Sequence, residues 1–147
     1  MIKKIGQGGC GEVFMVMHLA TDQIRAMKVV SKASDKVVQS VFDELNILRQ
    51  LDHPNIVKVF EYFQDDKNLY MIMEYLKGGS VFERLKITGH FGERDSAYII
   101  KQILQALNYL SEKRIVHRDL KIENILFSHE DQLKVKIVDF GSAIMID

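Results

Sequence analysis

The sequence has a single cysteine, Cys10, no net charge and no long apolar run. One cysteine excludes an internal disulfide framework and a metal site built from several cysteines, which favours a reducing, intracellular and cytoplasmic location. Twenty basic residues balance twenty acidic ones, so charge gives no reason to expect nucleic acid or an anionic membrane as a partner. No run approaches the roughly 20 apolar residues that span a bilayer, and the N-terminus lacks a signal-peptide pattern.

The composition, 47% hydrophobic and 27% charged, is typical of a globular protein. Segments rich in β-branched residues are separated by glycines and polar turns, which predicts strands over 2–5, 13–19, 24–30, 56–62 and 69–75. Over residues 36–51 the apolar residues instead recur at helical spacing, at Val38, Val41, Phe42, Leu45 and Leu48. We therefore expect an α+β fold whose first part is a five-stranded antiparallel sheet with one helix.

The second half has a helical pattern after the Lys77-Gly78-Gly79 segment. A short helix is predicted over 80–85 and a long one over 95–112, followed by short β segments at 125–127 and 134–138. Six residues of the long helix form an apolar face that we expect to be buried: Ile99, Ile100, Ile103, Leu104, Leu107 and Leu110. We take the glycine pair as a boundary between an N-terminal lobe, 1–77, and a helical C-terminal lobe, 78–147.

Glycines at positions 6, 8 and 11 form a G-x-G-x-x-G pattern between two predicted strands. Glycine lacks Cβ, so its backbone amides can approach phosphate oxygens closely. The same glycines would equally suit a simple hairpin. A strand follows them where a dinucleotide-binding fold would start a helix, which argues against that fold.

Lys28 ends an apolar strand in the segment Ala26-Met27-Lys28, and Glu44 lies on the predicted helix that follows. A lysine at a strand end is usually solvated. If Lys28 is partly buried it needs a counter-charge, and Glu44 would supply one while leaving the ammonium able to contact phosphate.

Two further motifs make a family resemblance specific. Residues 115–124 read I-V-H-R-D-L-K-I-E-N and residues 138–141 read V-D-F-G. Together with the glycine loop, Lys28 and Glu44, they resemble the catalytic loop and metal-binding motif of the protein kinases. The loop, with Lys121 two residues after Asp119, resembles that of serine/threonine kinases. The segments 70–75 and 100–110 resemble those of the calcium- and calmodulin-dependent group. The resemblance covers essentially the whole chain.

The resemblance implies a protein-kinase-like fold, ATP and magnesium as cofactors, and a protein substrate. Asp119 would orient the substrate hydroxyl and accept its proton, and Lys121 would neutralise charge on the transferred phosphoryl group. Lys28, held by Glu44, would contact the α- and β-phosphates, and Asn124 and Asp139 would hold the metal. The nucleotide would be enclosed by Gly6, Gly8, Gly11, Val13, Ala26, Met73, Glu74, Leu76 and Leu126.

The sequence departs from the family pattern in three places. Cys10 stands where an aromatic residue is usual at the tip of the glycine loop, and Ile122 replaces a common proline of the catalytic loop. After Gly141 only six residues remain, so we expect a chain shortened after the D-F-G motif, with exposed C-lobe surface that favours self-association.

Two classes of function follow. The first is transfer of phosphate from ATP to serine or threonine hydroxyls, as the activity of a parent enzyme that this chain alone would perform poorly. The alternative is an ATP-binding remnant or interaction fragment without transferase activity. The intact Lys28, Asp119, Asn124 and Asp139 favour the first.

Overall fold

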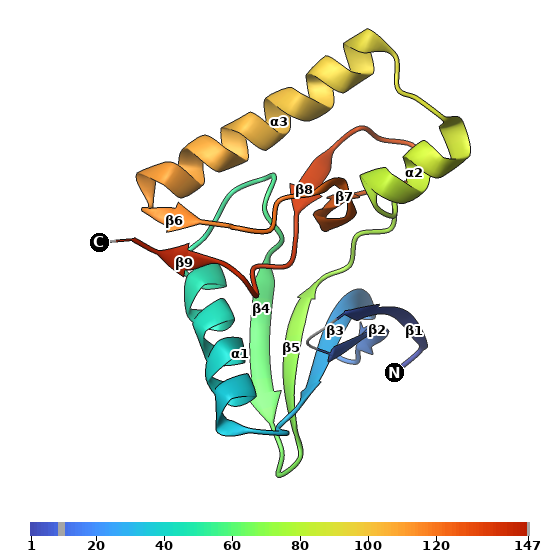
Figure 1. The fold of residues 1–147 in the computed structure, drawn as a ribbon. Helices are drawn as coiled ribbons and strands as arrows, with labels where there is room; N and C mark the ends of the chain where they lie inside the picture. The colour runs from blue at the N-terminus through green and yellow to red at the C-terminus, as the bar shows by residue number, and fades with distance from the viewer. Residues whose placement is uncertain (9–10, 147) are drawn as a thin grey trace.

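In a computed structural model that describes residues 1–8 and 11–146, the first part of the chain forms a five-stranded antiparallel sheet. The strand order is β1-β2-β3-β5-β4. The strands are Lys3–Gly8 (β1), Gly11–His18 (β2), Gln23–Ser31 (β3), Val59–Gln64 (β4) and Asn68–Glu74 (β5). Helix α1 (Asp35–Leu48) lies beside β4 and β5 (Figure 1). Cys10 lies outside the described residues.

The register of the sheet brings the predicted site residues of three strands to one face. Lys28 on β3 pairs with Val13 on β2 and with Met71 on β5, and Ala26 pairs with Met73. Side chains that are direct cross-strand partners, or two residues apart on one strand, share a face of the sheet. These five side chains therefore point to the same side.

Helix α1 begins at Ser34, whose hydroxyl accepts a hydrogen bond from the Val37 amide. The predicted apolar stripe is buried where it meets the sheet, at Val41, Leu45 and Leu48. Glu44, on the same face of the helix, is also buried. A carboxylate at such a position requires a partner, so its environment is central to the site.

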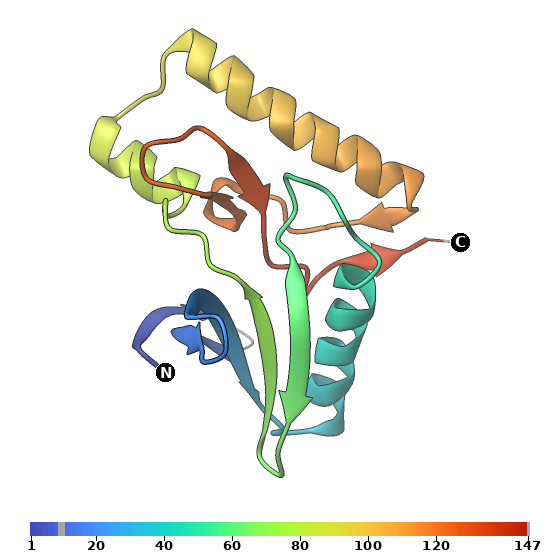
Figure 2. The same ribbon diagram turned by 180° about the vertical axis from the view of Figure 1, so that it is seen from behind.

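The second part of the chain is mainly helical. Its elements are α2 (Val81–Thr88), α3 (Glu93–Glu112), β6 (Ile115–Val116), a 3-10 turn η1 (Ile122–Asn124), β7 (Ile125–Phe127), β8 (Val135–Ile137) and β9 (Ile144–Met145). The hairpin of β7 and β8 lies between α3 and the sheet, as both views show (Figures 1 and 2). The predicted α+β fold is thus confirmed. The pairing of β6 with β9 was not predicted.

The predicted apolar face of α3 is only partly correct. Ile99, Ile103 and Leu110 are buried, whereas Ile100 and Leu104 are 53% and 59% exposed. The buried stripe instead runs through Gln102 and Ala106. These positions follow Ile99 and Ile103 at intervals of three residues, so the buried face is turned toward Gln102 and Ala106 and away from Ile100 and Leu104. In the described part of the chain, no helix has the length and apolar character needed to cross a membrane.

Gln102 can be buried at low cost because both of its polar side-chain atoms have hydrogen-bond partners. Its Oε1 accepts hydrogen bonds from Asn55 Nδ2 at 2.9 Å and from the Val135 amide at 3.1 Å. Its Nε2 donates to the Leu133 carbonyl at 2.9 Å and to the Tyr98 carbonyl at 3.2 Å. One side chain therefore joins α3, the β8 strand and the loop after α1.

Two buried serines differ in their hydrogen bonding, so the same substitution at each measures what a satisfied hydroxyl contributes to stability. Ser80 caps α2 in a reciprocal arrangement with Glu83, whereas the Ser128 hydroxyl has no hydrogen-bond partner among the described residues. Ser80→Ala should lower the free energy of unfolding by about 1 kcal/mol. Ser128→Ala should leave it unchanged or raise it by up to about 1 kcal/mol. Urea unfolding of both variants measures the difference, and equal losses would contradict the expectation.

Candidate active site

A cavity of about 310 Å³ lies between the sheet and the β7–β8 hairpin. Its wall combines apolar side chains from both parts of the chain with a few charged and amide groups. The lining residues are Ile5, Gly6, Gln7, Gly11, Val13, Ala26, Lys28, Glu44, Leu48, Val57, Met71, Met73, Glu74, Tyr75, Leu76, Asn124, Leu126, Val138 and Asp139. Such a slot, apolar with few polar groups, is the usual form of a small-molecule site.

A buried ion pair lies at the side of the cavity next to α1. Lys28 Nζ is 2.8 Å from Glu44 Oε2 and 3.0 Å from Oε1. The two side chains are 12% and 5% exposed. Two charges this well enclosed persist because each satisfies the other, and the lysine still borders the cavity. The counter-charge expected for Lys28 is therefore present.

The three glycines of the loop differ in whether the surrounding structure has room for a side chain. At Gly11 φ is +151°, and a Cβ would overlap the carbonyl oxygen of Val29 on the neighbouring strand. At Gly6 a Cβ would meet only Val13 Cβ, at 3.7 Å, so the described chain has room for a side chain there. Gly8 ends β1 and pairs with Gly11. The fold itself thus requires glycine at position 11, independently of any ligand.

The end of β5 is held by the side chain of its last residue, Glu74. Glu74 Oε1 accepts a hydrogen bond from the Lys58 amide at 2.7 Å and pairs with Lys136 Nζ at 2.8 Å. Lys136 belongs to β8, so this half-buried pair joins the end of the sheet to the hairpin. The Glu74 carboxylate is therefore used within the protein, and residues 74–76 border the cavity.

The catalytic-loop motif adopts a constrained backbone. Arg118 has φ of +64° and Asp139 has φ of +59°, a region that costs energy for residues other than glycine and often marks functional sites. His117 is 3% exposed and packs edge-on against Phe140, with ring centroids 4.7 Å apart. Its Nε2 lies 3.1 Å from the Val138 carbonyl. His117 therefore has a packing role.

Asp119 is held by two neighbours beside the cavity. Asn124 Nδ2 donates to the Asp119 carbonyl at 2.9 Å and to its Oδ2 at 3.0 Å, and Lys121 Nζ lies 3.1 Å from the same Oδ2. The Lys121 hydrogen bond lowers the pKa of the Asp119 carboxyl and, reciprocally, raises the pKa of Lys121. The carboxylate is thus ionised at neutral pH, and no hydrogen bond to its Oδ1 comes from the described residues.

Asp139 lies close to this group and to α1. It lines the cavity, and its Oδ1 accepts a hydrogen bond from the Gly141 amide at 3.4 Å. A Cβ on Gly141 would lie 3.7 Å from Glu44 Oε2. Phe140 between them is fully buried. The two predicted motifs and the Lys28–Glu44 pair therefore meet in one place.

Most residues predicted from the sequence line the cavity, and Asp119 and Lys121 lie just outside it, joined to it by Asn124. Sequence reasoning missed part of the wall: Ile5, Gln7, Leu48, Val57, Met71, Tyr75 and Val138. It also missed Lys136 as the partner of Glu74. The two-residue alternation of β5 and β8 was the available signal for Met71 and Val138, whereas no local pattern marks Lys136.

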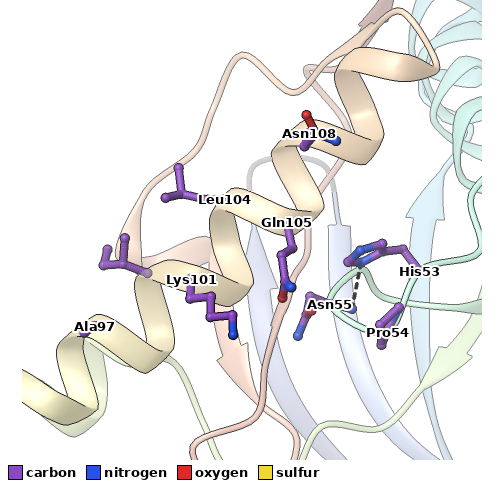
Figure 3. A pocket seen from close by; sticks show the side chains of 9 residues that line it. His53, Pro54, Asn55, Ala97, Lys101, Leu104, Gln105 and Asn108 are labelled. Atoms are coloured by element: carbon purple, nitrogen blue, oxygen red, sulfur yellow. Dashed lines mark hydrogen bonds between the residues drawn. The ribbon is translucent and has the colours of Figure 1, made fainter.

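A larger, open groove of about 770 Å³ lies elsewhere, between α3 and the loop 53–55 (Figure 3). It is lined by Ala97, Ile100, Lys101, Leu104, Gln105 and Asn108 on α3 and by His53, Pro54 and Asn55. Burial lowers the pKa of His53, and the charge of Lys136 adds to this. No described group of three acidic, histidine or cysteine side chains lies together in a way suited to a metal. This groove is larger than the cavity, but it contains none of the charged residues of the two motifs, so we do not take it as the functional site.

Comparison with known proteins agrees with the geometry. The model of the protein kinase domain family matches residues 1–147. Calcium-dependent protein kinase 5 of Plasmodium berghei (strain Anka) is 38% identical over 141 residues, which is 95% of this chain and 25% of that protein. The chain thus spans about a quarter of the length of this relative.

The contact between Lys121 and Asp119 can be tested by titration. Lys121→Met removes the hydrogen bond and the charge, so the pKa of Asp119 should rise toward its ordinary value in a ¹³C NMR titration. Because this pKa is lower in the folded chain than in the unfolded one, ionised Asp119 stabilises the fold at higher pH, and this stabilisation is lost as pH falls through the folded-state pKa. Lys101→Met, an exposed change on α3, should leave the titration unchanged. An identical midpoint in Lys121→Met would contradict the assignment.

Proposed function

This chain belongs to the protein kinase family, and we propose that it binds magnesium-ATP in the cavity and that its site transfers the terminal phosphate to serine or threonine hydroxyls of proteins. The observation that carries the proposal is the joining of an apolar slot, a buried Lys28–Glu44 pair and the Asp119 group within one site. Phosphoryl transfer needs positioned charge more than covalent chemistry, and this site supplies it.

The nucleotide base suits the apolar part of the cavity. Val13 and Ala26 border it from the sheet, and Leu126 and Val138 border it from the hairpin. A flat ring between such side chains removes apolar surface from water on both faces. In this proposal the backbone of residues 74–76 pairs with the edge of the base, since the Glu74 side chain already has partners.

The phosphates would then extend toward Lys28. Its ammonium contacts the α- and β-phosphates in this proposal while Glu44 keeps it in place. The glycine loop of residues 6–11 covers the phosphates with backbone amides. These roles use positions that border the same cavity.

The residues present suit magnesium. Asn124 gives both of its amide hydrogens to Asp119, so its Oδ1 faces away from that residue, and the Asp139 carboxylate borders the same cavity. Magnesium prefers a few oxygen ligands from the protein together with substrate phosphates. Bound by Asn124 and Asp139, it would neutralise phosphate charge.

Asp119 and Lys121 provide the groups for transfer. The free Oδ1 of Asp119 orients the hydroxyl and takes its proton in this proposal, while Lys121 faces the transferred phosphoryl group. Serine/threonine specificity is supported by the H-R-D-L-K sequence of the loop, and the similar Plasmodium protein is named a calcium-dependent protein kinase.

Nucleotide binding has a direct test in thermal unfolding. At a hundredfold excess over its dissociation constant, magnesium-ATP should add about 2.7 kcal/mol to the stability of the chain. The double variant Lys28→Met/Glu44→Leu removes both buried charges together, so it should stay folded but lose most of this ligand-induced increase. Lys101→Met should keep it. A folded wild-type chain whose melting temperature does not respond to magnesium-ATP would refute the proposed binding.

Phosphate transfer is tested by Asp119→Asn in the longest expressible form of the protein that carries these residues. Transfer of labelled phosphate from ATP to a serine peptide should fall by about 10²- to 10⁴-fold, while ATP affinity stays within about twofold. Asp131→Asn, in the exposed hairpin turn, is the matched control. A tyrosine peptide of otherwise identical sequence tests specificity. If the wild type binds ATP but transfers phosphate to neither peptide, the alternative of ATP binding without transfer is supported instead.

A further inference from the structure

Arg84 on α2 stands outside the cavity, yet its guanidinium joins two segments that adjoin residues of the cavity wall, the chain at residue 78 and the turn after β7. Nη2 lies 3.4, 3.3 and 3.1 Å from the carbonyl oxygens of Gly78, His129 and Glu130, which share its two hydrogens, and Nη1 donates to that of Gln132 at 3.2 Å. Gly78 follows the predicted base-binding segment, and the other three carbonyls belong to the turn between β7 and β8. All these acceptors are backbone groups, so the contact is independent of the acceptors' side chains.

The guanidinium also lies over the ring of Phe127, with its central carbon 3.5 Å from the ring centroid. Phe127 is fully buried, and burial lowers the pKa of the half-buried Arg84. A planar group with donors along its edges can stack and serve four carbonyls together, whereas an ammonium has three donors and no flat face. Arginine is thus suited to this position in a way that lysine is not.

The strand that carries Phe127 transmits this contact to the cavity. Leu126 and Phe127 are neighbours on β7, so their side chains point to opposite faces of the strand. Phe127 faces Arg84, and Leu126 borders the cavity. The position of Leu126 therefore depends on how the back of the strand is held.

The segment after the base-binding residues runs tightly along this strand. The Gly78 amide donates to the Phe127 carbonyl at 3.0 Å, and the Phe127 amide donates to the Gly79 carbonyl at 2.9 Å. A Cβ on Gly78 would overlap both the His129 carbonyl oxygen and Phe127 Cβ. With so little space between the segments, a shift of the turn displaces residues 76–79 as well.

We propose that Arg84 is a positioning residue for nucleotide binding: its guanidinium clamps the β7–β8 turn to residue 78 and so fixes Leu126 and residues 74–76 around the base. This inference rests on the proposed function. It concerns the base and not the phosphates, because Lys28, Asn124 and Asp139 have no described hydrogen bond to Arg84 or to the turn.

The test compares adenosine, which has the base without phosphates, with magnesium-ATP by calorimetry at a temperature where each variant is folded. Arg84→Lys keeps the charge but loses the fork and the stacking, so it should weaken both ligands by the same factor, about tenfold. Arg94→Lys, an exposed arginine at the start of α3, should change neither. The double variant Lys28→Met/Glu44→Leu, which leaves no unpaired buried charge, should weaken magnesium-ATP far more than adenosine.

The outcomes are distinct. A lower melting temperature of Arg84→Lys with unchanged adenosine affinity would give the clamp a structural role only and would overturn the inference. Weaker ATP binding with normal adenosine binding would also overturn it, because the effect would then lie at the phosphates. A wild-type chain that binds neither ligand overturns the proposed function and this inference with it. If Arg84→Lys does not fold, hydrogen exchange of the Arg84 Nη hydrogens in the wild type decides. Linkage requires adenosine to slow that exchange if the clamp favours binding.

Discussion

The buried pair of Lys28 and Glu44 is the constraint on which the geometry of the site depends. At 12% and 5% exposure, neither charge is stable without the other. The ion pair therefore fixes the distance between the sheet, which carries Lys28, and α1, which carries Glu44. That separation lets Leu45 and Leu48 of α1 enter the common core, and it places the Glu44 carboxylate beside Gly141. The position of α1, the burial of Phe140 and the direction of Asp139 are therefore linked.

Local sequence patterns predicted the elements that have a strong period and could not predict the contacts between distant segments. The stripe of α1 and the alternation in the sheet follow from spacing, and the order of the motifs identified the catalytic loop. The buried face of α3 was predicted partly on the wrong side of the helix, because hydropathy does not show that Gln102, a polar residue, is buried with four hydrogen bonds. The β6–β9 pair consists of two-residue strands, which are too short to have a period.

The candidate site shows the same division. Charged residues in a recognisable motif, such as Asp119 and Lys121, could be placed from the sequence, whereas Lys136 and Arg84 could not, because their partners are 62 positions away, at Glu74, or are backbone carbonyls. The glycine loop is intermediate. Its spacing suggested phosphate binding at each glycine, but at Gly11 the contact with Val29 already requires glycine. A motif can therefore be recognised correctly while the reason for one of its residues lies in packing.

The environment of Asp119 limits the chemistry it can perform in the proposed reaction. A general base is most effective when its pKa is near the working pH, yet hydrogen bonds from Lys121 and Asn124 lower the pKa of this carboxyl. Asp119 would thus be a poor base for removing a hydroxyl proton early in the reaction. The same two contacts hold Oδ2 and fix the direction of Oδ1, which favours orientation of the hydroxyl. In a loose transition state the hydroxyl proton becomes acidic only as the bond between oxygen and phosphorus forms. A weakly basic but well-oriented carboxylate is therefore sufficient to receive the proton late in the reaction.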